Sequence, residues 1–236
     1  MGVNMAPCEQ QFDTPKQLDA ALAIAVAARL AAAIESRGEA WLVVSGGRTP
    51  LGFFAQLAAQ PLRWEKVIVT LADERWVDNH HLDSNEKLVR EQLLCGPAAA
   101  AQFLPLADLS TDIDSAVSEL DYRLMRAPRF AALVLGMGED GHTASLFPGA
   151  TALQQGLDIN SGRSCIIVEP LTAPHLRVSL TLPRLLDSDE IFVHIVGPSK
   201  QQVLAKARAS GEVSELPIRA VLRQHAAPVT IYWSGQ

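Results

Sequence analysis

The sequence predicts an α/β fold in which an open, mostly parallel Rossmann-like sheet carries helices on both faces. Short apolar runs recur along the chain without alternating polar residues, as in strands that are covered on both faces. Segments with helix start and stop signals separate these runs, and strands that alternate with helices are typical of a parallel sheet. No repeat or linker interrupts the pattern, so we expect a single domain over residues 1–236.

The first helix is predicted from its caps. Thr14 can be the N-cap, Pro15 occupies the first helical position, and Gln17 completes a capping box. Gly38 is suited to end this helix. The predicted strands that follow span residues 41–44, 67–71, 131–135, 165–168, 178–180, 191–196 and 229–233. The further predicted helices span residues 49 onward, 83–94, 116–125, 182–186, 199–209 and 217–223, and residues 98–115 are expected to form an irregular surface excursion.

Composition and charge narrow the functional classes. The chain has 26 acidic and 20 basic residues, and its formal net charge of -6 disfavours nucleic-acid binding. The three cysteines are widely spaced and resemble neither a disulfide framework nor a zinc site, which favours a reducing compartment. Residues 1–11 lack the pattern of a signal peptide, so we expect a cytoplasmic protein. The apolar stretch 20–34 is short for a membrane span and contains Arg29, so we expect a buried helix and no membrane partner.

The first polar cluster follows the strand predicted at residues 41–44. Its two glycines allow a ligand to approach the backbone closely, and the helix N-terminus that follows offers free N–H groups and a positive dipole end, which suit a phosphate. A well-capped strand–turn–helix explains the same pattern, and the residues alone leave both interpretations open. The cluster consists of Ser45, Gly46, Gly47, Arg48, Thr49 and Pro50, where Thr49 is expected to cap the helix that Pro50 begins.

Charged residues at two further places are candidates for ligand contacts. Asp73 and Arg75 directly follow the strand predicted at residues 67–71 and are expected to face a cleft, with Glu74 pointing elsewhere. Arg177 and Lys200 lie near predicted strand ends, where a cation can clamp an anion. A salt-bridged loop and ordinary surface charges are the alternative interpretations.

The glycine-rich segment 136–149 carries the most specific chemical signal. It follows the most apolar predicted strand, and within it a single glycine separates Asp140 from His142. Histidine is the side chain best matched to proton transfer near neutral pH, and the flanking glycines clear space around its imidazole. We therefore expect His142 to be functional rather than structural.

The remaining histidines carry less signal. His80 and His81 lie together in a polar loop, but a bare pair does not specify a metal. His175, His194 and His225 have no companions at ligand spacing along the chain. We therefore expect neither a metal site nor a cofactor.

Taken together, the four clusters resemble the 6-phosphogluconolactonase family. The matching motifs occur in the family's order: SGGRTP at 45–50, DERWV with DSN at 73–77 and 83–85, GMGEDGHTASLFPG at 136–149, and RVSLTLP with GPSK at 177–183 and 197–200. Two positions depart from the family pattern, since Arg48 stands where a small serine is common and Asp78 where proline is common.

The resemblance implies a fold similar to that of glucosamine-6-phosphate deaminase and hydrolysis of 6-phospho-D-glucono-1,5-lactone in the oxidative branch of the pentose phosphate pathway, with no cofactor. It implies that His142 is the general base with Asp140 beside it, and that Asp73 and Arg75 line the sugar end of the site. The implied phosphate site comprises Ser45, Gly46, Gly47, Arg48, Thr49, Arg177 and Lys200.

The chemistry agrees with these residues, because a lactone needs a positioned water, a base and an oxyanion donor. No GxSxG elbow is present, so direct attack by water is favoured over an acyl-enzyme. Arg75 or a backbone N–H of residues 136–141 is the candidate oxyanion donor.

Two alternative functions stay open. The first is a sugar-phosphate isomerase or deaminase of the same fold, although Phe147 stands where the deaminases have a glutamate, five residues after the histidine. The second is a non-catalytic sugar-phosphate sensor, which would need a DNA-binding segment that the sequence does not offer. The sequence leaves the oligomeric state open between a monomer and a small homo-oligomer.

Overall fold

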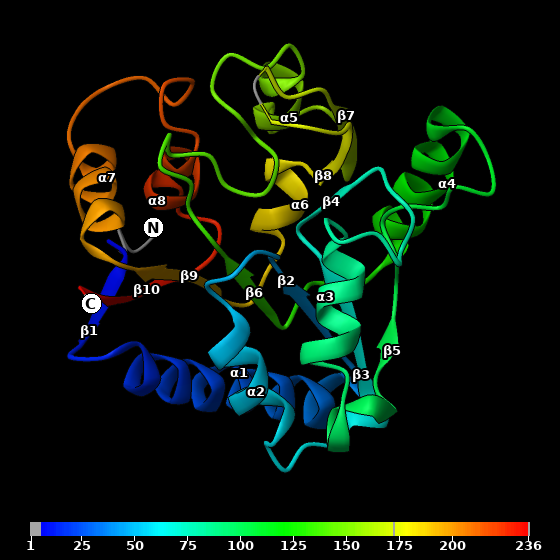
Figure 1. The fold of residues 1–236 in the computed structure, drawn as a ribbon, viewed down its shortest axis with the longest axis vertical. Helices are drawn as coiled ribbons and strands as arrows, with labels where there is room; N and C mark the ends of the chain where they lie inside the picture. The colour runs from blue at the N-terminus through cyan, green and yellow to red at the C-terminus, as the bar shows by residue number, and fades with distance from the viewer. Residues whose placement is uncertain (1–5, 172, 236) are drawn as a thin grey trace.

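The computed structural model describes residues 6–171 and 173–235, and a parallel sheet of seven strands forms its centre (Figure 1). The strand order is β1-β10-β9-β6-β2-β3-β5, and every neighbouring pair is parallel. The predicted open parallel sheet is therefore confirmed. The strands are β1 (Cys8–Phe12), β2 (Ala40–Val44), β3 (Val67–Leu71), β5 (Gln102–Phe103), β6 (Ala132–Leu135), β9 (Ile191–Val196) and β10 (Val229–Ser234).

Helices cover both faces of this sheet. In Figure 1, α1 (Pro15–Arg37) and α2 (Leu51–Ala58) lie below the sheet, whereas α7 (Pro198–Arg208) and α8 (Ile218–Arg223) lie above it. The predicted capping box of α1 is present, and Gly38 ends the helix in the left-handed conformation with φ 83°. By length and composition α1 could cross a membrane, but half of its apolar stretch is buried inside the protein, as in the core helix of a globular domain.

Three strands form a second, antiparallel sheet in the order β4-β8-β7. They are β4 (Asp73–Arg75), β7 (Cys165–Val168) and β8 (Arg177–Leu180). The predictions at 165–168 and 178–180 were correct as strands, but these strands do not join the parallel sheet. A short apolar run specifies burial and not the direction of its partner, so the sequence offered no means of separating the two sheets. Because β4 begins two residues after β3 ends, the small sheet stands at the carboxyl edge of the large one.

The remaining helices are α3 (Asn85–Gln92), α4 (Ile113–Arg126), α5 (Leu153–Leu157) and α6 (Leu182–Leu186), with 3₁₀ turns at Trp64–Lys66 and Gly96–Ala100. The α3 helix begins with Ser84 as N-cap, whose side chain accepts the N–H of Lys87. Two expectations were wrong. Thr49 does not cap α2, because Pro50 takes the N-cap position without a side-chain hydrogen bond. The segment 98–115 is not a surface excursion, since it contains the edge strand β5, and Leu104 and Leu106 are buried.

Strands β1, β4 and β5 and helix α5 were not predicted. They are two to five residues long, which is too short for a periodic pattern to emerge. The strand β1 is also largely exposed, because it pairs only with β10 at the edge of the sheet. We expect no signal peptide in residues 1–11, and residues 1–5 of this segment lie outside the described residues.

Candidate active site

A cavity of about 250 Å³ lies at the carboxyl ends of the central strands. Loops that follow β2, β3, β6 and β9 meet there, as expected for a ligand site of an open α/β sheet. The predicted site residues that line this cavity are Ser45, Gly46, Gly47, Thr49, Asp73, Arg75, His142, Arg177 and Lys200. Segments far apart in the sequence therefore converge on one cavity.

His142 and Asp140 form a close pair beside the cavity. The Nδ1 atom of His142 lies 2.5 Å from Oδ1 of Asp140, and the backbone N–H of His142 donates to the same oxygen at 3.1 Å. Gly138 makes this turn possible, since a Cβ atom there would lie 2.1 Å from His142 Nδ1 and 2.5 Å from the Asp140 carboxylate. The loop is closed by a hydrogen bond from Gly138 N to the His142 carbonyl oxygen at 2.8 Å.

The surroundings keep the Asp140 carboxylate ionised. Partial burial opposes its ionisation, but the hydrogen bond with the His142 side chain, the charge of that imidazole and the backbone N–H together lower the pKa of Asp140 below its ordinary 3.8. Because Nδ1 of His142 faces this carboxylate, the ring is oriented with Nδ1 as the donor and Nε2 as the free nitrogen.

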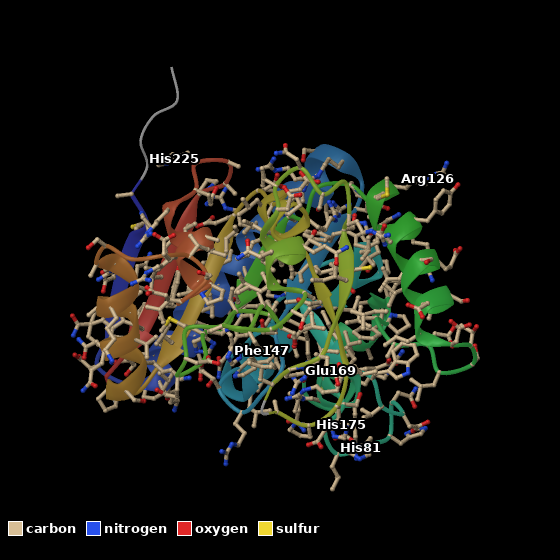
Figure 2. The ribbon with its side chains drawn as sticks, turned by 90° about the horizontal axis from the view of Figure 1, so that it is seen from above. His81, Arg126, Phe147, Glu169, His175 and His225 are labelled. Carbon is tan, nitrogen blue, oxygen red and sulfur yellow. The ribbon has the colours of Figure 1, made fainter. Side chains whose placement is uncertain are left out.

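The phenyl ring of Phe147 packs against both His142 and Arg177. The rings of His142 and Phe147 pack with their centroids 4.4 Å apart. The guanidinium carbon of Arg177 lies 5.5 Å from the centroid of the same phenyl ring. Phe147, labelled in Figure 2, therefore restricts both side chains without offering an ionisable group of its own.

Asp73, Arg75 and Arg177 come from the small antiparallel sheet. Arg75 pairs directly with Arg177 across strands β4 and β8, so the two cations share a neighbourhood. The Asp73 carboxylate lies beside Arg177: its Oδ2 accepts the Ser145 hydroxyl at 2.5 Å and lies 3.9 Å from Arg177 Nη1. Burial lowers the pKa of the Arg177 guanidinium from its ordinary value, and the Asp73 charge opposes this change.

The Arg177 side chain is almost fully buried in the wall of the cavity. It is 7% exposed, and its Nε finds no hydrogen-bond partner among residues 6–171 and 173–235.

Glu74 points away from the cavity, as expected from its alternation with Asp73 and Arg75. It is 1% exposed, and its carboxylate accepts the backbone N–H groups of Asn85 and Glu86 at the start of α3. Burial raises the pKa of Glu74 above its ordinary value, although these hydrogen bonds oppose the shift. Glu74 therefore anchors the N-terminus of α3 beneath the site.

Asn85 belongs to the cavity, although we did not single it out from the sequence. Its Nδ2 donates to the Asp73 carbonyl oxygen at 2.8 Å, and its Oδ1 accepts from Arg75 Nη1 at 2.7 Å. Gly46 is required for this arrangement, because a Cβ atom at that position would lie 1.9 Å from Asn85 Oδ1. The only signal in the sequence was the DSN motif at 83–85.

Two helix N-termini meet the other end of the cavity. Gly47, with φ 94°, and Thr49 precede α2, and Lys200 lies in the first turn of α7 with its Nζ 3.3 Å from Glu139 Oε1. Arg48 is exposed and is not among the residues that line the cavity, so its predicted part in the phosphate site stays a prediction.

His194 was also missed, since we expected it to have no companion. It lines the cavity from β9, is 4% exposed, and its Nε2 lies 3.3 Å from Asp19 Oδ1 of α1. Likewise, the structure brings candidate ligand atoms of His81, Asp83 and His175 within 4.8 Å of one another, a grouping that we did not predict. Both groupings join residues that are far apart in the sequence, which no local spacing reveals.

The comparisons with known proteins agree with the site. Residues 13–233 match the family model described as glucosamine-6-phosphate isomerases/6-phosphogluconolactonase. The chain is 46% identical over 225 residues to a 6-phosphogluconolactonase of Rhizobium meliloti strain 1021, covering 94% of this chain and 97% of that protein. A crystal structure of a 6-phosphogluconolactonase from Shewanella baltica OS155 superposes with a TM-score of 0.94 at 41% identity, covering 99% of this chain and all of that one.

The predicted similarity to the deaminase fold is confirmed as well. A monomeric glucosamine-6-phosphate deaminase superposes with a TM-score of 0.80 at 16% identity over 96% of this chain and 97% of that chain, which shows a common fold and nothing more. The identities and coverage found above are those of true relatives. This chain belongs to the glucosamine-6-phosphate isomerase/6-phosphogluconolactonase family.

Proposed function

We propose that this protein hydrolyses 6-phospho-D-glucono-1,5-lactone to 6-phospho-D-gluconate, as a cytoplasmic enzyme of the oxidative branch of the pentose phosphate pathway. The observation that carries the proposal is the His142–Asp140 pair at the edge of a cavity rich in cationic and N–H groups. The high identity to proteins named for this reaction supports the same substrate.

His142 acts as the general base in this proposal. Its Nδ1–H donates to Asp140, so the lone pair on Nε2 accepts a proton from water as that water attacks the lactone carbonyl. The tetrahedral intermediate then collapses with cleavage of the ring C–O bond, and the imidazolium returns its proton to the departing ring oxygen. The ionised Asp140 stabilises the imidazolium between these two steps.

Developing charge on the carbonyl oxygen needs a donor. Arg75 lines the cavity, and its guanidinium donates hydrogen bonds to the Asp83 carbonyl oxygen and to Asn85 Oδ1. These bonds orient its positive charge. The backbone N–H groups of residues 136–141 are the alternative donor. Asp73, fixed by the Ser145 hydroxyl, is placed to accept hydrogen bonds from the sugar hydroxyl groups.

The phosphate is assigned to the helix N-termini and the cations that line the same cavity. Gly46, Gly47 and Thr49 at the start of α2 present backbone N–H groups, and Lys200 and Arg177 supply positive charge. The place of Arg177 in the cavity lining supports its assignment to an anion. Arg48 is left out of this proposal because it lies outside the cavity.

The rival deaminase activity lacks a group that it would need. Opening a sugar ring calls for a titratable side chain at position 147, and Phe147 instead packs against His142. We predict that glucosamine 6-phosphate is not turned over at a rate comparable to lactone hydrolysis. Ammonia release measured with an enzyme-coupled assay checks this expectation.

The decisive test is hydrolysis of freshly generated 6-phosphogluconolactone, with the spontaneous ring opening subtracted. We expect a rate that is proportional to protein concentration and lost on heat denaturation. A rate equal to the spontaneous one would refute the proposal and leave the sensor interpretation. Comparable turnover of glucosamine 6-phosphate would instead favour the deaminase.

A further inference from the structure

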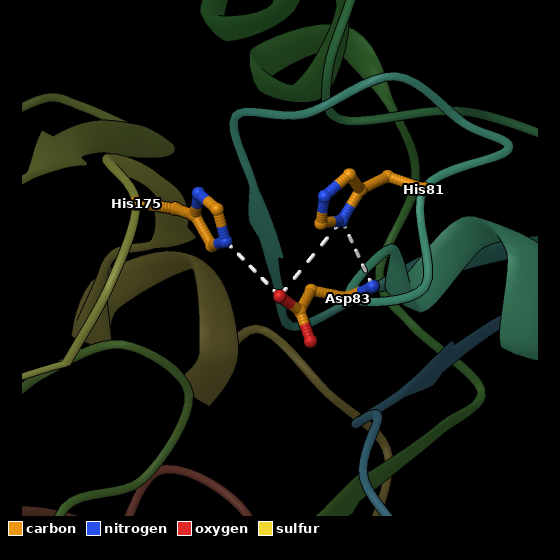
Figure 3. Close-up of side chains that lie close together, drawn as sticks. All are labelled: His81, Asp83 and His175. Atoms are coloured by element: carbon orange, nitrogen blue, oxygen red, sulfur yellow. Dashed lines mark hydrogen bonds and ion pairs between the residues drawn. The ribbon is translucent and has the colours of Figure 1, made fainter.

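Two histidines and a carboxylate meet at the surface, outside the cavity (Figure 3). His81 and Asp83 belong to the connection between β4 and α3, and His175 lies just before β8. Oδ2 of Asp83 is 3.0 Å from His175 Nε2 and 3.8 Å from His81 Nδ1. One candidate ligand atom from each residue lies within 4.8 Å of the other two.

These distances are close to those of a coordination sphere. Zinc binds imidazole nitrogen and carboxylate oxygen at about 2.0–2.2 Å, which places neighbouring ligand atoms of a tetrahedral site roughly 3.3 Å apart. The separations of 3.0 and 3.8 Å bracket this value, so small side-chain rotations are enough to accommodate an ion. The side chains are between 29% and 53% exposed, so an ion from solution can reach them.

The ligand types select the metal. Two imidazoles with one carboxylate suit zinc and its neighbours in the transition series, whereas magnesium and calcium prefer oxygen ligands alone. His81 Nδ1 accepts the backbone N–H of Asp83 at 3.1 Å, so this nitrogen carries no proton, and an ion bound to it would replace that hydrogen bond. We propose that His81, Asp83 and His175 bind a divalent transition-metal ion, best matched by Zn²⁺, with water completing the coordination.

The position of the cluster predicts what the ion does. Trp76 N donates to the Leu176 carbonyl oxygen at 2.7 Å, so the two segments already touch beside the cluster. Arg75 Nη1 donates to the Asp83 carbonyl oxygen, and Arg177 follows His175 by two residues. A bound ion would therefore fasten together the two segments that carry these arginines to the cavity wall. This role goes beyond the proposed hydrolysis and does not make the ion a participant in it.

Tag-free protein, treated with a chelator and then dialysed, is titrated with ZnCl₂ by calorimetry. We expect one equivalent to bind and a saturating concentration to raise Tm by roughly 5 °C. Co²⁺ in place of Zn²⁺ should give visible d–d absorption bands with the same stoichiometry. These readouts are independent of catalysis, so they succeed or fail separately from the proposed function.

Substitution of the ligands tests the location. His175 has φ 69°, which asparagine tolerates better than most residues, so His175→Asn keeps the backbone while removing the imidazole. His81→Gln keeps an acceptor for the Asp83 N–H. Loss of a residue that only supports a metal ligand weakens metal binding by about tenfold to a hundredfold. Each variant removes a ligand itself, so its Zn²⁺ affinity should fall by at least this factor.

Matched controls come from histidines outside the cluster. His80→Gln changes the exposed neighbour of His81, and His225→Asn changes a histidine at the opposite edge of the molecule (Figure 2). Both should bind Zn²⁺ as wild type does. The proposal fails if wild type binds no Zn²⁺, if His175→Asn and His81→Gln bind normally, or if His142→Gln alone abolishes binding, which would move the ion to the cavity.

Discussion

Two of the histidine–aspartate pairs in the protein differ more in their surroundings than in their geometry. The His142–Asp140 pair has a separation of 2.5 Å, and the His175–Asp83 pair has one of 3.0 Å. The first is two residues apart in the chain and lies in a glycine-rich loop beside the cavity. The second joins residues 92 positions apart at the surface.

The neighbours of each pair decide its chemistry. Asp140 serves one imidazole and the backbone N–H of the same residue, which leaves Nε2 of His142 free to take a proton. Asp83 lies between two imidazoles, which is an arrangement suited to a cation. A histidine–aspartate pair therefore indicates a function only together with what surrounds it.

The largest expected effect separates the pairs directly. Replacing His142 with glutamine removes the base, and kcat for lactone hydrolysis should fall by roughly a hundredfold or more. Circular dichroism and Tm should show an intact fold, and the exposed His225→Asn variant should retain wild-type kcat. A folded His142→Gln protein with near-normal kcat would show that the pair beside the cavity is not catalytic.

The next effect concerns the phosphate. Charge-assisted hydrogen bonds contribute about 1.5–3 kcal/mol each, so Arg177→Ala should lower kcat/KM for the phosphorylated lactone by roughly tenfold to a hundredfold. Lys200→Ala should act in the same direction. The comparison is made with gluconolactone, which lacks the phosphate and should be affected little by either change. Equal losses with both lactones would place the phosphate elsewhere.

The pH dependence of kcat/KM tests whether protonation of His142 or of Asp140 controls the rate in the proposed catalytic pair. A histidine base accepts a proton only as the neutral imidazole, so kcat/KM should fall as the pH is lowered from about 8 to 5. Asp140 does not contribute, because a carboxyl group with a lowered pKa keeps its charge above that value and loses it only below pH 3.8. Initial rates in buffers of constant ionic strength would detect this change, and a flat profile contradicts a histidine base.

The smallest expected effect is that of chelation. The lactone carbonyl needs no Lewis acid in the proposed mechanism, so removal of metal should change kcat by less than about twofold. The same chelator should reverse the Tm increase expected from Zn²⁺ at the surface cluster. Loss of hydrolysis on chelation, with recovery on adding zinc, would show that hydrolysis depends on a metal ion.

The accuracy of the predictions varied along the chain for a physical reason. Helix α1 was predicted from Thr14, Pro15 and Gly38, because caps depend on hydrogen bonds between residues three or four apart. The apolar runs of the parallel strands were also located correctly. The two-residue strand β5 and the exposed strand β1 escaped, because their residues carry no burial pattern and their partners lie far along the chain.

The candidate site shows the same division. The Asp140–His142 pair was visible in the sequence because a turn of three residues brings its members together. Only a glycine at position 138 fits beside them. The places of Asn85 and His194 in the cavity were not visible, since Asn85 is held by a hydrogen bond to β4 and His194 faces Asp19 of helix α1. Arg48 is exposed and outside the cavity lining, so its predicted place in the site stays a prediction.

The sequence by itself determined the α/β class, the strand-to-helix alternation and the local histidine–aspartate pair. These depend on burial patterns, caps and turns, which are interactions among neighbours in the chain. Only the tertiary structure decided that β4, β7 and β8 form their own antiparallel sheet and that His81, Asp83 and His175 meet. Contacts of this kind depend on how the whole chain packs, because residues 92 positions apart approach each other only after the two sheets have been assembled.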